Sequence, residues 1–275
     1  SATVETGVTL EKFQNFLEEE GFIFPLDLGS KGSCFLGGNL ATNAGGTRVI
    51  KYGMMRDLTL GIEVVLADGT LISNLHNLVK DNSGYDLKQI FIGSEGTLGV
   101  ITKATLKFYQ EPKTQNVAFC GVDSLDELLN LLISCKKELG SDLSAFEVLW
   151  KSTYEFIISS TSIKAPLPTK YNYYVLIETL GNKPAIDDKW FSETLSKFLS
   201  KKIIKDAIIS SSQKDIKNLW NVRNNTSTAF KTIPLRMNFD ISVNLNLIQK
   251  FVAQLEKEIL AFKEVKDILF FGHLG

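Results

Sequence analysis

A lone histidine close to the end of the sequence is the residue most suited to chemistry. His273 lies in FGHLG, between Gly272 and Leu274, directly after the apolar run DILFF. An imidazole can transfer protons or bind a metal ion, and its glycine neighbour gives it little to pack against. A single imidazole is a weak metal ligand, so a metal site would need further ligands. We interpret His76, in SNLHNL, as an ordinary surface residue.

A second candidate group lies in LWNVRNNTS. Trp220, Arg223 and Ser227 are spaced i, i+3 and i+7, which places them on one face of a helix. A guanidinium and a hydroxyl one turn apart can hold a carboxylate through charge-assisted hydrogen bonds. The alternative is a surface arginine beside a core tryptophan.

Two glycine-rich tracts form the third candidate. The first, GGNLATNAGGTRVIKYG, spans 37–53, and the second, DNSGYDLKQIFIGSEGTLGVIT, spans 81–102. Exposed main-chain amides in such tracts allow close approach of a planar or phosphorylated ligand, although tight turns with capping side chains would look the same. GSEGTLG leads into a β-rich segment, so it is not the dinucleotide fingerprint, and the absence of GK[ST] excludes a P-loop.

The first 112 residues must position the glycine tracts. TLEKFQNFLEEEG predicts an amphipathic helix, with Thr9 as its N-cap and Gly21 as its end. GIEVVLADGTLIS predicts a β-hairpin that turns at Asp68-Gly69. KQIFIGSEGTLGVITKATLKF predicts a strand, a glycine turn and a second strand, and 29–61 predicts an ordered loop.

After Pro112 the pattern changes to strands that alternate with long helices, so we place a domain boundary there and expect domains at 1–112 and 113–275. The expected class is α+β, with a mainly antiparallel sheet and helices on one face. The predicted strands are 116–122, 143–149, 171–179, 236–243 and 267–271. The predicted helices are 124–140, 184–199, 215–230 and 247–262.

Composition excludes several classes of function. The 275 residues carry 30 basic and 31 acidic side chains without a long basic run, so nucleic acid is a poor partner. No apolar run is long enough for a transmembrane span. Three widely spaced cysteines argue against a disulfide framework and a cysteine zinc site, and favour a reducing compartment.

The glycine tracts, LGIEVVLADGT and LSAFE together resemble the FAD-linked oxidase family, which has a flavin domain of the vanillyl-alcohol-oxidase (PCMH) type. The resemblance runs from about Glu5 to Gly275. It implies FAD as cofactor and oxidation of a D-2-hydroxy acid by hydride transfer to flavin N5. D-2-hydroxyglutarate is the substrate expected from this resemblance, with D-lactate or glycolate as alternatives.

The resemblance also implies which residues contact FAD. In the first tract they are Gly38, Asn39, Thr42, Asn43, Gly45, Gly46, Tyr52 and Gly53. In the second they are Gly84, Tyr85, Glu95, Gly96, Thr97, Gly99, Val100 and Ile101. The family carries a pyrophosphate loop further upstream, which this sequence lacks, so we expect the chain alone to bind FAD weakly or not at all.

On the substrate side, the resemblance makes Arg223 the ligand of the C1 carboxylate, with Ser227 keeping a hydroxyl where the family has threonine. Asn238 stands where the hydroxyglutarate enzymes carry lysine, which favours a substrate without a distal carboxylate unless Arg236 compensates. His273 matches the first half of the family's metal motif. It would be one ligand of a divalent metal, with zinc expected, that polarises the substrate hydroxyl.

The remaining expectations follow from the same resemblance. The flavin would pass electrons to a flavoprotein, a quinone or an oxo acid, and a homodimer is compatible with the sequence. The compartment would be the mitochondrial matrix in a eukaryote and the cytoplasm in a bacterium. A non-catalytic flavoprotein fragment or interaction module is the alternative from another class. It is distinguished by whether the natural gene continues through the metal motif and begins upstream with the pyrophosphate loop.

Overall fold

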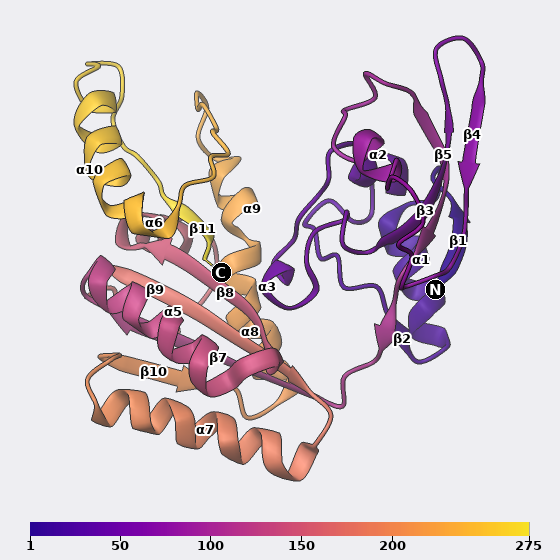
Figure 1. Ribbon diagram of the computed structural model, residues 1–275. Helices are drawn as coiled ribbons and strands as arrows, with labels where there is room; N and C mark the ends of the chain where they lie inside the picture. The colour runs from indigo at the N-terminus through magenta and orange to yellow at the C-terminus, as the bar shows by residue number, and fades with distance from the viewer. Residues whose placement is uncertain (275) are drawn as a thin grey trace. The chain divides into compact units, whose positions relative to one another are not determined.

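The computed structural model describes residues 1–274, and the chain divides into two compact units, 1–112 and 113–275 (Figure 1). Each unit has its own sheet and its own helices, and the two are described separately below. The first contains the two glycine tracts, and the second contains Arg223 and His273.

Unit 1 is built on an antiparallel four-stranded sheet with the order β1-β5-β3-β4. Its strands are β1 (Ala2–Glu5), β5 (Val100–Leu106), β3 (Thr59–Val65) and β4 (Leu71–Asn74), and a two-stranded ribbon pairs β2 (Phe22–Ile23) with β6 (Tyr109–Gln110). β3 and β4 form the predicted hairpin, closed by a hydrogen bond from the Leu66 amide to the Thr70 carbonyl. Gly69 has a φ of 86°, as the turn requires.

Four helices complete unit 1: α1 (Leu10–Glu19), α2 (Leu36–Ala41), α3 (Val49–Tyr52) and α4 (Lys88–Phe91). α1 is the predicted amphipathic helix. Its Leu10, Phe13 and Leu17 are buried in the core, and the Thr9 hydroxyl accepts a hydrogen bond from the Lys12 amide. The strand predicted to begin with KQIF is wrong, because residues 88–91 form the single-turn helix α4. Only Phe91 of this helix is buried.

Unit 2 has a five-stranded antiparallel sheet with the order β10-β7-β9-β8-β11. The strands are β7 (Thr114–Val122), β8 (Leu143–Trp150), β9 (Tyr173–Gly181), β10 (Asp206–Ile209) and β11 (Phe271–His273). The mainly antiparallel α+β class predicted from the sequence is therefore confirmed. β10 was not predicted, and the last strand begins at Phe271, where the predicted one ends.

The helices of unit 2 are α5 (Leu125–Leu139), α6 (Lys151–Ser160), α7 (Pro184–Ser200), α8 (Gln213–Asn224), α9 (Thr226–Phe230) and α10 (Ile248–Ile259), with 3-10 turns at 140–142 and 245–247. Ser124 caps α5 by accepting from the Glu127 amide, and Gly140 ends it, as predicted. α6 was not predicted. The predicted helix over 215–230 is divided at Asn225 into α8 and α9.

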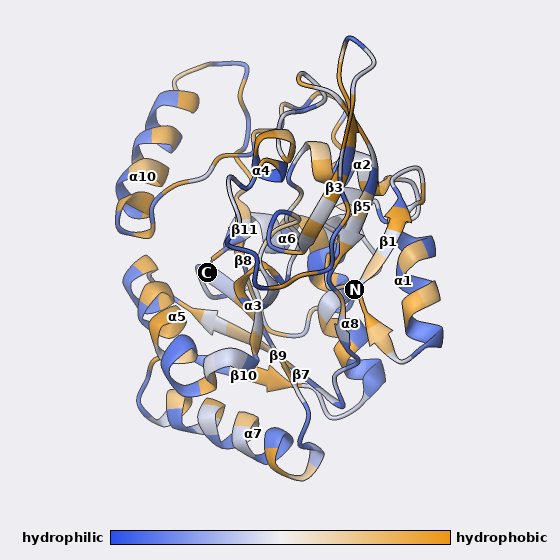
Figure 2. Ribbon diagram, turned by 45° about the vertical axis from the view of Figure 1, so that its right-hand side comes forward, coloured by the Kyte–Doolittle hydropathy of each residue, from blue (hydrophilic) through white to orange (hydrophobic). Residues whose placement is uncertain are grey.

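The expectation of helices on one face of this sheet is wrong, because helices pack against both faces. α6 and α8 form one core with alternate strand residues such as Val117, Phe119 and Leu176. α5 and α7 also contact the sheet, and the intervening residues Ala118 and Cys120 are buried as well. Figure 2 shows apolar and polar positions alternating around α5 and α7, as expected of helices with one buried face.

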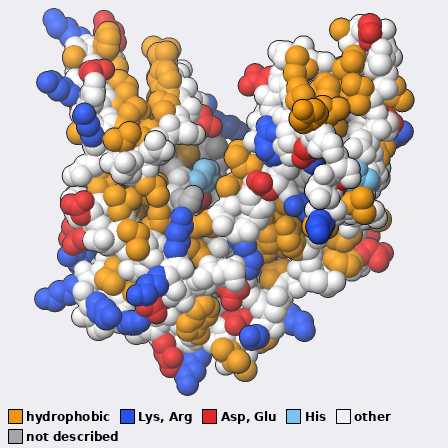
Figure 3. Space-filling model, viewed as in Figure 1, with side chains coloured by type: hydrophobic (Ala, Val, Ile, Leu, Met, Phe, Trp, Pro, Cys, Tyr) orange, Lys and Arg blue, Asp and Glu red, His pale blue; other side chains and the backbone are white. Residues whose placement is uncertain are grey.

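The predicted strand at 236–243 is also wrong. Residues 234–244 contain no helix or strand, and every second side chain is an exposed apolar one, from Leu235 at 93% through Met237 at 81% to Phe239 at 67%. Apolar and polar residues do alternate here, but a strand also needs a neighbouring strand that pairs with its main-chain N–H and C=O groups. No segment within residues 1–274 pairs with 236–243 in this way. Figure 3 shows hydrophobic side chains at the surface in this region and around α10, whose own large apolar residues are half-buried or buried.

Candidate functional site

The two glycine tracts lie against each other in unit 1. The Gly93 amide donates to the Leu40 carbonyl at 3.0 Å, and the Glu95 amide donates to the Ala41 carbonyl at 2.8 Å. The end of α2 and the turn after α4 are therefore joined by main-chain hydrogen bonds. Two tracts can contact the same ligand only if they lie side by side, and these hydrogen bonds bring them together.

Arg56 ties the same two tracts together through its backbone and its side chain. Its amide donates to Asn43 Oδ1 at 2.9 Å. Its guanidinium donates to the Gln89 carbonyl at 2.8 Å and to the Ile92 carbonyl at 2.5 Å. Sequence reasoning did not single out Arg56. The signal available was a basic residue between the two tracts, which alone does not indicate a partner.

The backbone of both tracts takes conformations that restrict the residue type. Gly96 has a φ of 77°, and Asn43 and Glu95, which are not glycines, have φ values of 48° and 52°. Asparagine tolerates this region better than most residues, whereas Glu95 is strained there. A Cβ on Gly46 would lie 2.2 Å from the Asp27 carbonyl oxygen, so only glycine fits at that position.

The remaining first-tract candidates have different environments. Asn39 is 4% exposed, and within residues 1–274 its Nδ2 has no hydrogen-bond partner. The Thr42 hydroxyl donates to the Gly38 carbonyl at 2.9 Å. The ring of Tyr52 packs against Tyr109. Gly45 lies against Met54 and Val49, and Gly53 has a φ of 77° beside Asp57.

The second-tract candidates are not all at the joined loops. Thr97 donates to the Ser94 carbonyl at 2.6 Å inside the turn. Gly99 packs on Val64, Val100 is 65% exposed, and the Ile101 side chain is buried in the core of unit 1. Gly84 and Tyr85 lie in the loop before α4, where the Tyr85 side chain is 94% exposed. Within residues 1–274 no hydrogen bond or ring contact joins these two residues to the other candidates, so they stay predictions.

In unit 2, α8 carries two side chains that contact buried acids on the sheet. Trp220 Nε1 donates to Glu178 Oε2 on β9 at 3.0 Å, and Arg223 Nε donates to Glu147 Oε2 on β8 at 2.6 Å. Both glutamates are at most 1% exposed. Ser227 lies beyond the break at Asn225, in α9, and is exposed.

The structure brings Arg223 and His273 to the same carboxylate. His273 Nδ1 lies 2.5 Å from Glu147 Oε1, while Arg223 occupies Oε2. The Arg223 guanidinium also lies over the ring of Phe271, 5.0 Å from its centroid. Its side chain is 12% exposed, and among residues 1–274 its two terminal nitrogens have no hydrogen-bond partner.

Sequence reasoning noted LSAFE as a motif but did not assign a role to its glutamate, Glu147. The available signal was an acid near the centre of a strand whose other residues, apart from Ser144, are apolar. Such a group is buried only with a partner. The sequence did not show that the partners are Arg223 and His273, which lie 76 and 126 residues further along the chain.

The segment predicted to hold a distal carboxylate is open to solvent. Arg236 and Asn238 are both exposed, and Arg236 Nη1 donates to the Phe230 carbonyl at 2.5 Å. Because no strand forms at 236–243, the backbone does not hold Arg236 and Asn238 on one side of a sheet, and compensation by Arg236 stays a prediction.

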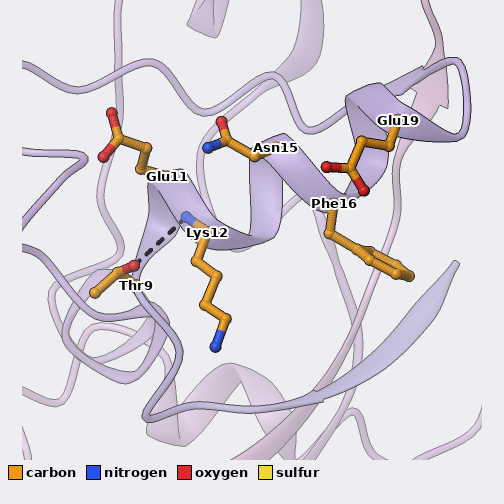
Figure 4. Close-up of a pocket in the computed structure, with 6 residues that line it drawn as sticks. All are labelled: Thr9, Glu11, Lys12, Asn15, Phe16 and Glu19. Carbon is orange, nitrogen blue, oxygen red and sulfur yellow. Dashed lines mark hydrogen bonds between the residues drawn. The ribbon is translucent and has the colours of Figure 1, made fainter.

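Other groups contribute less to a site. His76 Nε2 pairs with Asp81 at 3.1 Å, in keeping with a structural role. Within residues 1–274 no three histidine, cysteine or acidic side chains cluster as a metal site would require, and no helix is long and apolar enough to cross a membrane. A shallow pocket on the outer face of α1, lined by Lys12, Asn15 and neighbouring residues, contains none of the candidate site residues (Figure 4).

Comparison with known proteins gives two matches to protein families. Residues 1–74 match the FAD binding domain, and 111–275 match the C-terminal domain of FAD linked oxidases. The mitochondrial D-2-hydroxyglutarate dehydrogenase of Danio rerio is 39% identical over 273 residues, which cover 99% of this chain and 51% of that protein. Its counterpart in Bos taurus is 41% identical over 271 residues, which cover 98% of this chain and 49% of that protein.

The chain therefore spans about half the length of the curated relatives it matches. Among solved structures, an alkyldihydroxyacetonephosphate synthase superposes with a TM-score of 0.69 at 18% identity, covering 94% of this chain and 52% of that one. At this identity the likeness shows the fold alone.

Proposed function

Because the chain belongs to the FAD-linked oxidases, we propose that it forms part of an enzyme that oxidises a D-2-hydroxy acid to the 2-oxo acid with FAD as cofactor. D-2-hydroxyglutarate is the proposed substrate, since the relatives named above carry that activity in their names. Unit 1 would hold the flavin and unit 2 would hold the acid. Arg223 is the observation that most directly supports unit 2 as the acid-binding unit, because only its Nε is hydrogen-bonded to Glu147 and its two terminal nitrogens remain for a ligand.

The residues of unit 1 fit a flavin nucleotide. The joined tracts provide a main-chain surface in which Gly46 cannot carry a side chain. Asn39 adds a buried amide donor that no residue within 1–274 satisfies. A buried unpaired donor is costly unless a ligand or water accepts from it. Asn39, Asn43, Gly45, Gly46 and Gly96 are therefore the residues we propose to hold FAD. Ile101 fits least, because its side chain belongs to the core.

The residues of unit 2 fit a carboxylate. A guanidinium presents its donors in a planar fork that matches the two oxygens of a carboxylate. Arg223 donates its Nε–H to Glu147, so both terminal nitrogens remain available to donate to the two oxygens of a substrate carboxylate. Packing on Phe271 limits the swing of the side chain. Arg223 would bind the C1 carboxylate and so orient the adjacent C2.

The reaction removes two hydrogens from the substrate. When bound, FAD supplies the acceptor for the hydride from C2, while the hydroxyl proton leaves and the C2–O double bond forms. The contribution of this chain is orientation. Arg223 would hold one end of the substrate, and Ser227 of the adjacent α9 would supply a hydroxyl only if α9 turns it toward the acid.

The identity of the acid depends on the exposed segment around Asn238. A five-carbon diacid needs a second cationic or polar contact, which Arg236 and Asn238, both exposed here, could supply only if 234–244 pack around it. D-lactate or glycolate needs no such contact, which favours a shorter acid as the second candidate.

We also propose a divalent metal, with zinc the first candidate because zinc readily takes imidazole nitrogen. The described residues supply one ligand to it, His273. We propose the mitochondrial matrix as the compartment, on the ground that the relatives are named mitochondrial. An electron acceptor of the flavoprotein, quinone or oxo acid class would reoxidise the flavin.

The test is anaerobic reduction of protein-bound FAD, measured on the 275-residue chain and on the longest natural form of the protein. D-2-hydroxyglutarate should bleach the flavin absorbance of the longest form, and the L-enantiomer should not. No reduction by D-2-hydroxyglutarate, D-lactate or glycolate contradicts the proposed function. Stoichiometric FAD on the 275-residue chain would instead contradict only the expectation that this chain binds flavin weakly.

Arg223→Ala tests the proposed carboxylate site within that assay. The loss of two charge-assisted hydrogen bonds should lower kcat/KM by about 100-fold or more. Asn224→Ala, an exposed neighbour on the same helix, is the matched control and should stay within about threefold, as surface substitutions commonly do. Near-normal kinetics for Arg223→Ala would remove this residue from the site.

A further inference from the structure

Glu147 is a buried acid with one strong partner on each oxygen. It lies on β8, and its side chain has no solvent exposure. Oε2 accepts from Arg223 Nε at 2.6 Å, and Oε1 lies 2.5 Å from His273 Nδ1. His273 is also its direct cross-strand partner on β11, so the sheet register itself places the two side chains together.

The hydrogen-bond chemistry fixes which nitrogen of His273 carries the proton. A carboxylate oxygen can only accept, so in the neutral imidazole Nδ1 must be the donor to Oε1. Nε2 then carries the lone pair. Arg223 is likewise held through Nε, while its terminal nitrogens have no partner among residues 1–274. One carboxylate therefore determines what both side chains present to a ligand.

We propose that Glu147 is a positioning residue that turns the terminal nitrogens of Arg223 toward an anionic carboxylate and holds His273 in the tautomer whose Nε2 is an acceptor. The choice of a carboxylate as ligand rests on the proposed function, but the pairing itself does not. The simpler alternative is an ion pair that only fastens α8 and β11 to β8. The two differ in whether changing Glu147 alters the chemical state of His273.

Glu147→Gln makes that difference measurable. A glutamine offers one acceptor and one donor in the same place. Because Arg223 Nε–H can only donate, the amide oxygen must face Arg223, and the amide NH₂ then faces His273 Nδ1. Nδ1 can accept this bond only as the unprotonated nitrogen, so His273 should change from the Nδ1–H to the Nε2–H tautomer.

Long-range ¹H–¹⁵N spectra of the two imidazoles report this change directly, recorded where their shifts no longer depend on pH. His76 is an internal control, because its Nε2 pairs with Asp81 and should carry the proton. The wild-type chain should therefore show opposite tautomers for its two histidines. Asp81→Ala, in an exposed loop, should move only the His76 signals. An Nε2–H tautomer for His273 in the wild type, or an unchanged tautomer in Glu147→Gln, overturns the proposal.

Activity separates this inference from the proposed function. In the flavin-loaded longest form, Glu147→Gln should raise KM for the hydroxy acid about tenfold, and this effect should disappear when Arg223 is already alanine. A full effect in the Arg223→Ala background shows that Glu147 does not act through Arg223. If no hydroxy acid is oxidised while the tautomers are as stated, the proposed function fails and the pairing stands.

Discussion

The hydrogen bond between Trp220 and Glu178 should be a main contributor to the stability of unit 2. Trp220 is 7% exposed, and its Nε1 donates to a carboxylate that is itself fully buried. Trp220→Phe removes this donor and part of the ring. Hydrogen bonds to charged groups contribute about 1.5–3 kcal/mol, and a cavity of roughly 40 Å³ costs about 1 kcal/mol more. The free energy of unfolding should fall by about 3 kcal/mol.

Fluorescence can measure this loss in unit 2 alone. The sequence contains three tryptophans, Trp150, Trp190 and Trp220, and all three lie in 113–275. Urea unfolding of the variant is therefore followed through the two that remain, and the midpoint should fall without a change in slope. Trp190→Phe is the control, because this indole is half-buried and donates no hydrogen bond to any residue within 1–274. It should cost less than about 1 kcal/mol.

A loss below about 1 kcal/mol in Trp220→Phe would refute this reasoning. It would mean that Ser144 and Gln115, which also donate to Glu178 at 2.7 Å each, satisfy the carboxylate without the indole. α8 would then be held mainly by its apolar contacts.

Two further predictions concern thiols and glycines. Burial raises the pKa of Cys120 to about 12 and that of Cys135 well above its ordinary value, so a thiol reagent at neutral pH should label only Cys34 until the chain unfolds. Since both pKa values lie above the ordinary value of 9.0, the stabilisation from burying neutral thiols is complete below about pH 9 and should fall as pH rises toward 12. Gly46→Ala should lower the melting temperature measured by circular dichroism, because its Cβ meets the Asp27 backbone, whereas Gly38→Ala in α2 has open space and should be neutral or stabilising. Equal melting of the two variants, or early labelling of Cys135, would contradict these assignments.

The elements that the sequence predicted best carry a local signal at one end or at both. α5 has a serine N-cap and a glycine end, α7 begins with a proline in its first turn, and α1 has Thr9 as its cap. Such signals depend on neighbouring residues and do not require knowledge of the tertiary structure. The strands β7, β8 and β9 were found from their apolar composition.

The elements that were predicted wrongly depend on distant partners. The run YYVLIETLG of β9 is buried along its length, which is typical of a strand covered on both faces, yet one face was expected to be open. RMNFDISV has the alternation of a strand but no neighbour among residues 1–274. KQIF is too short for periodicity to separate a helix from a strand.

The sequence singled out the members of the candidate site but not the contacts between them. Residue type and spacing drew attention to Arg223, His273 and the glycine tracts, whose roles stay proposals. Their mutual contacts were not predicted, because hydrogen bonds such as Gly93 to Leu40 and Arg223 to Glu147 join residues more than 50 apart in the chain. The face shared by Trp220 and Arg223 was recognised, but its acidic partners on the sheet were not.

The two buried glutamates explain why Trp220 and Arg223 are three residues apart in α8, whether or not Arg223 binds a ligand. Three residues of helix rise by about 4.5 Å, close to the spacing of about 4.8 Å between adjacent strands. Trp220 and Arg223, three residues apart, accordingly reach Glu178 on β9 and Glu147 on β8, which are neighbours in the sheet. Trp220 has a single N–H, which it donates to the Glu178 carboxylate, so it has no donor left for a ligand. Arg223 spends one of its five N–H donors on docking and keeps four on its terminal nitrogens. An arginine at this position can therefore fix the helix and still bind an acid, which lysine, with its single nitrogen, could not do in the same geometry.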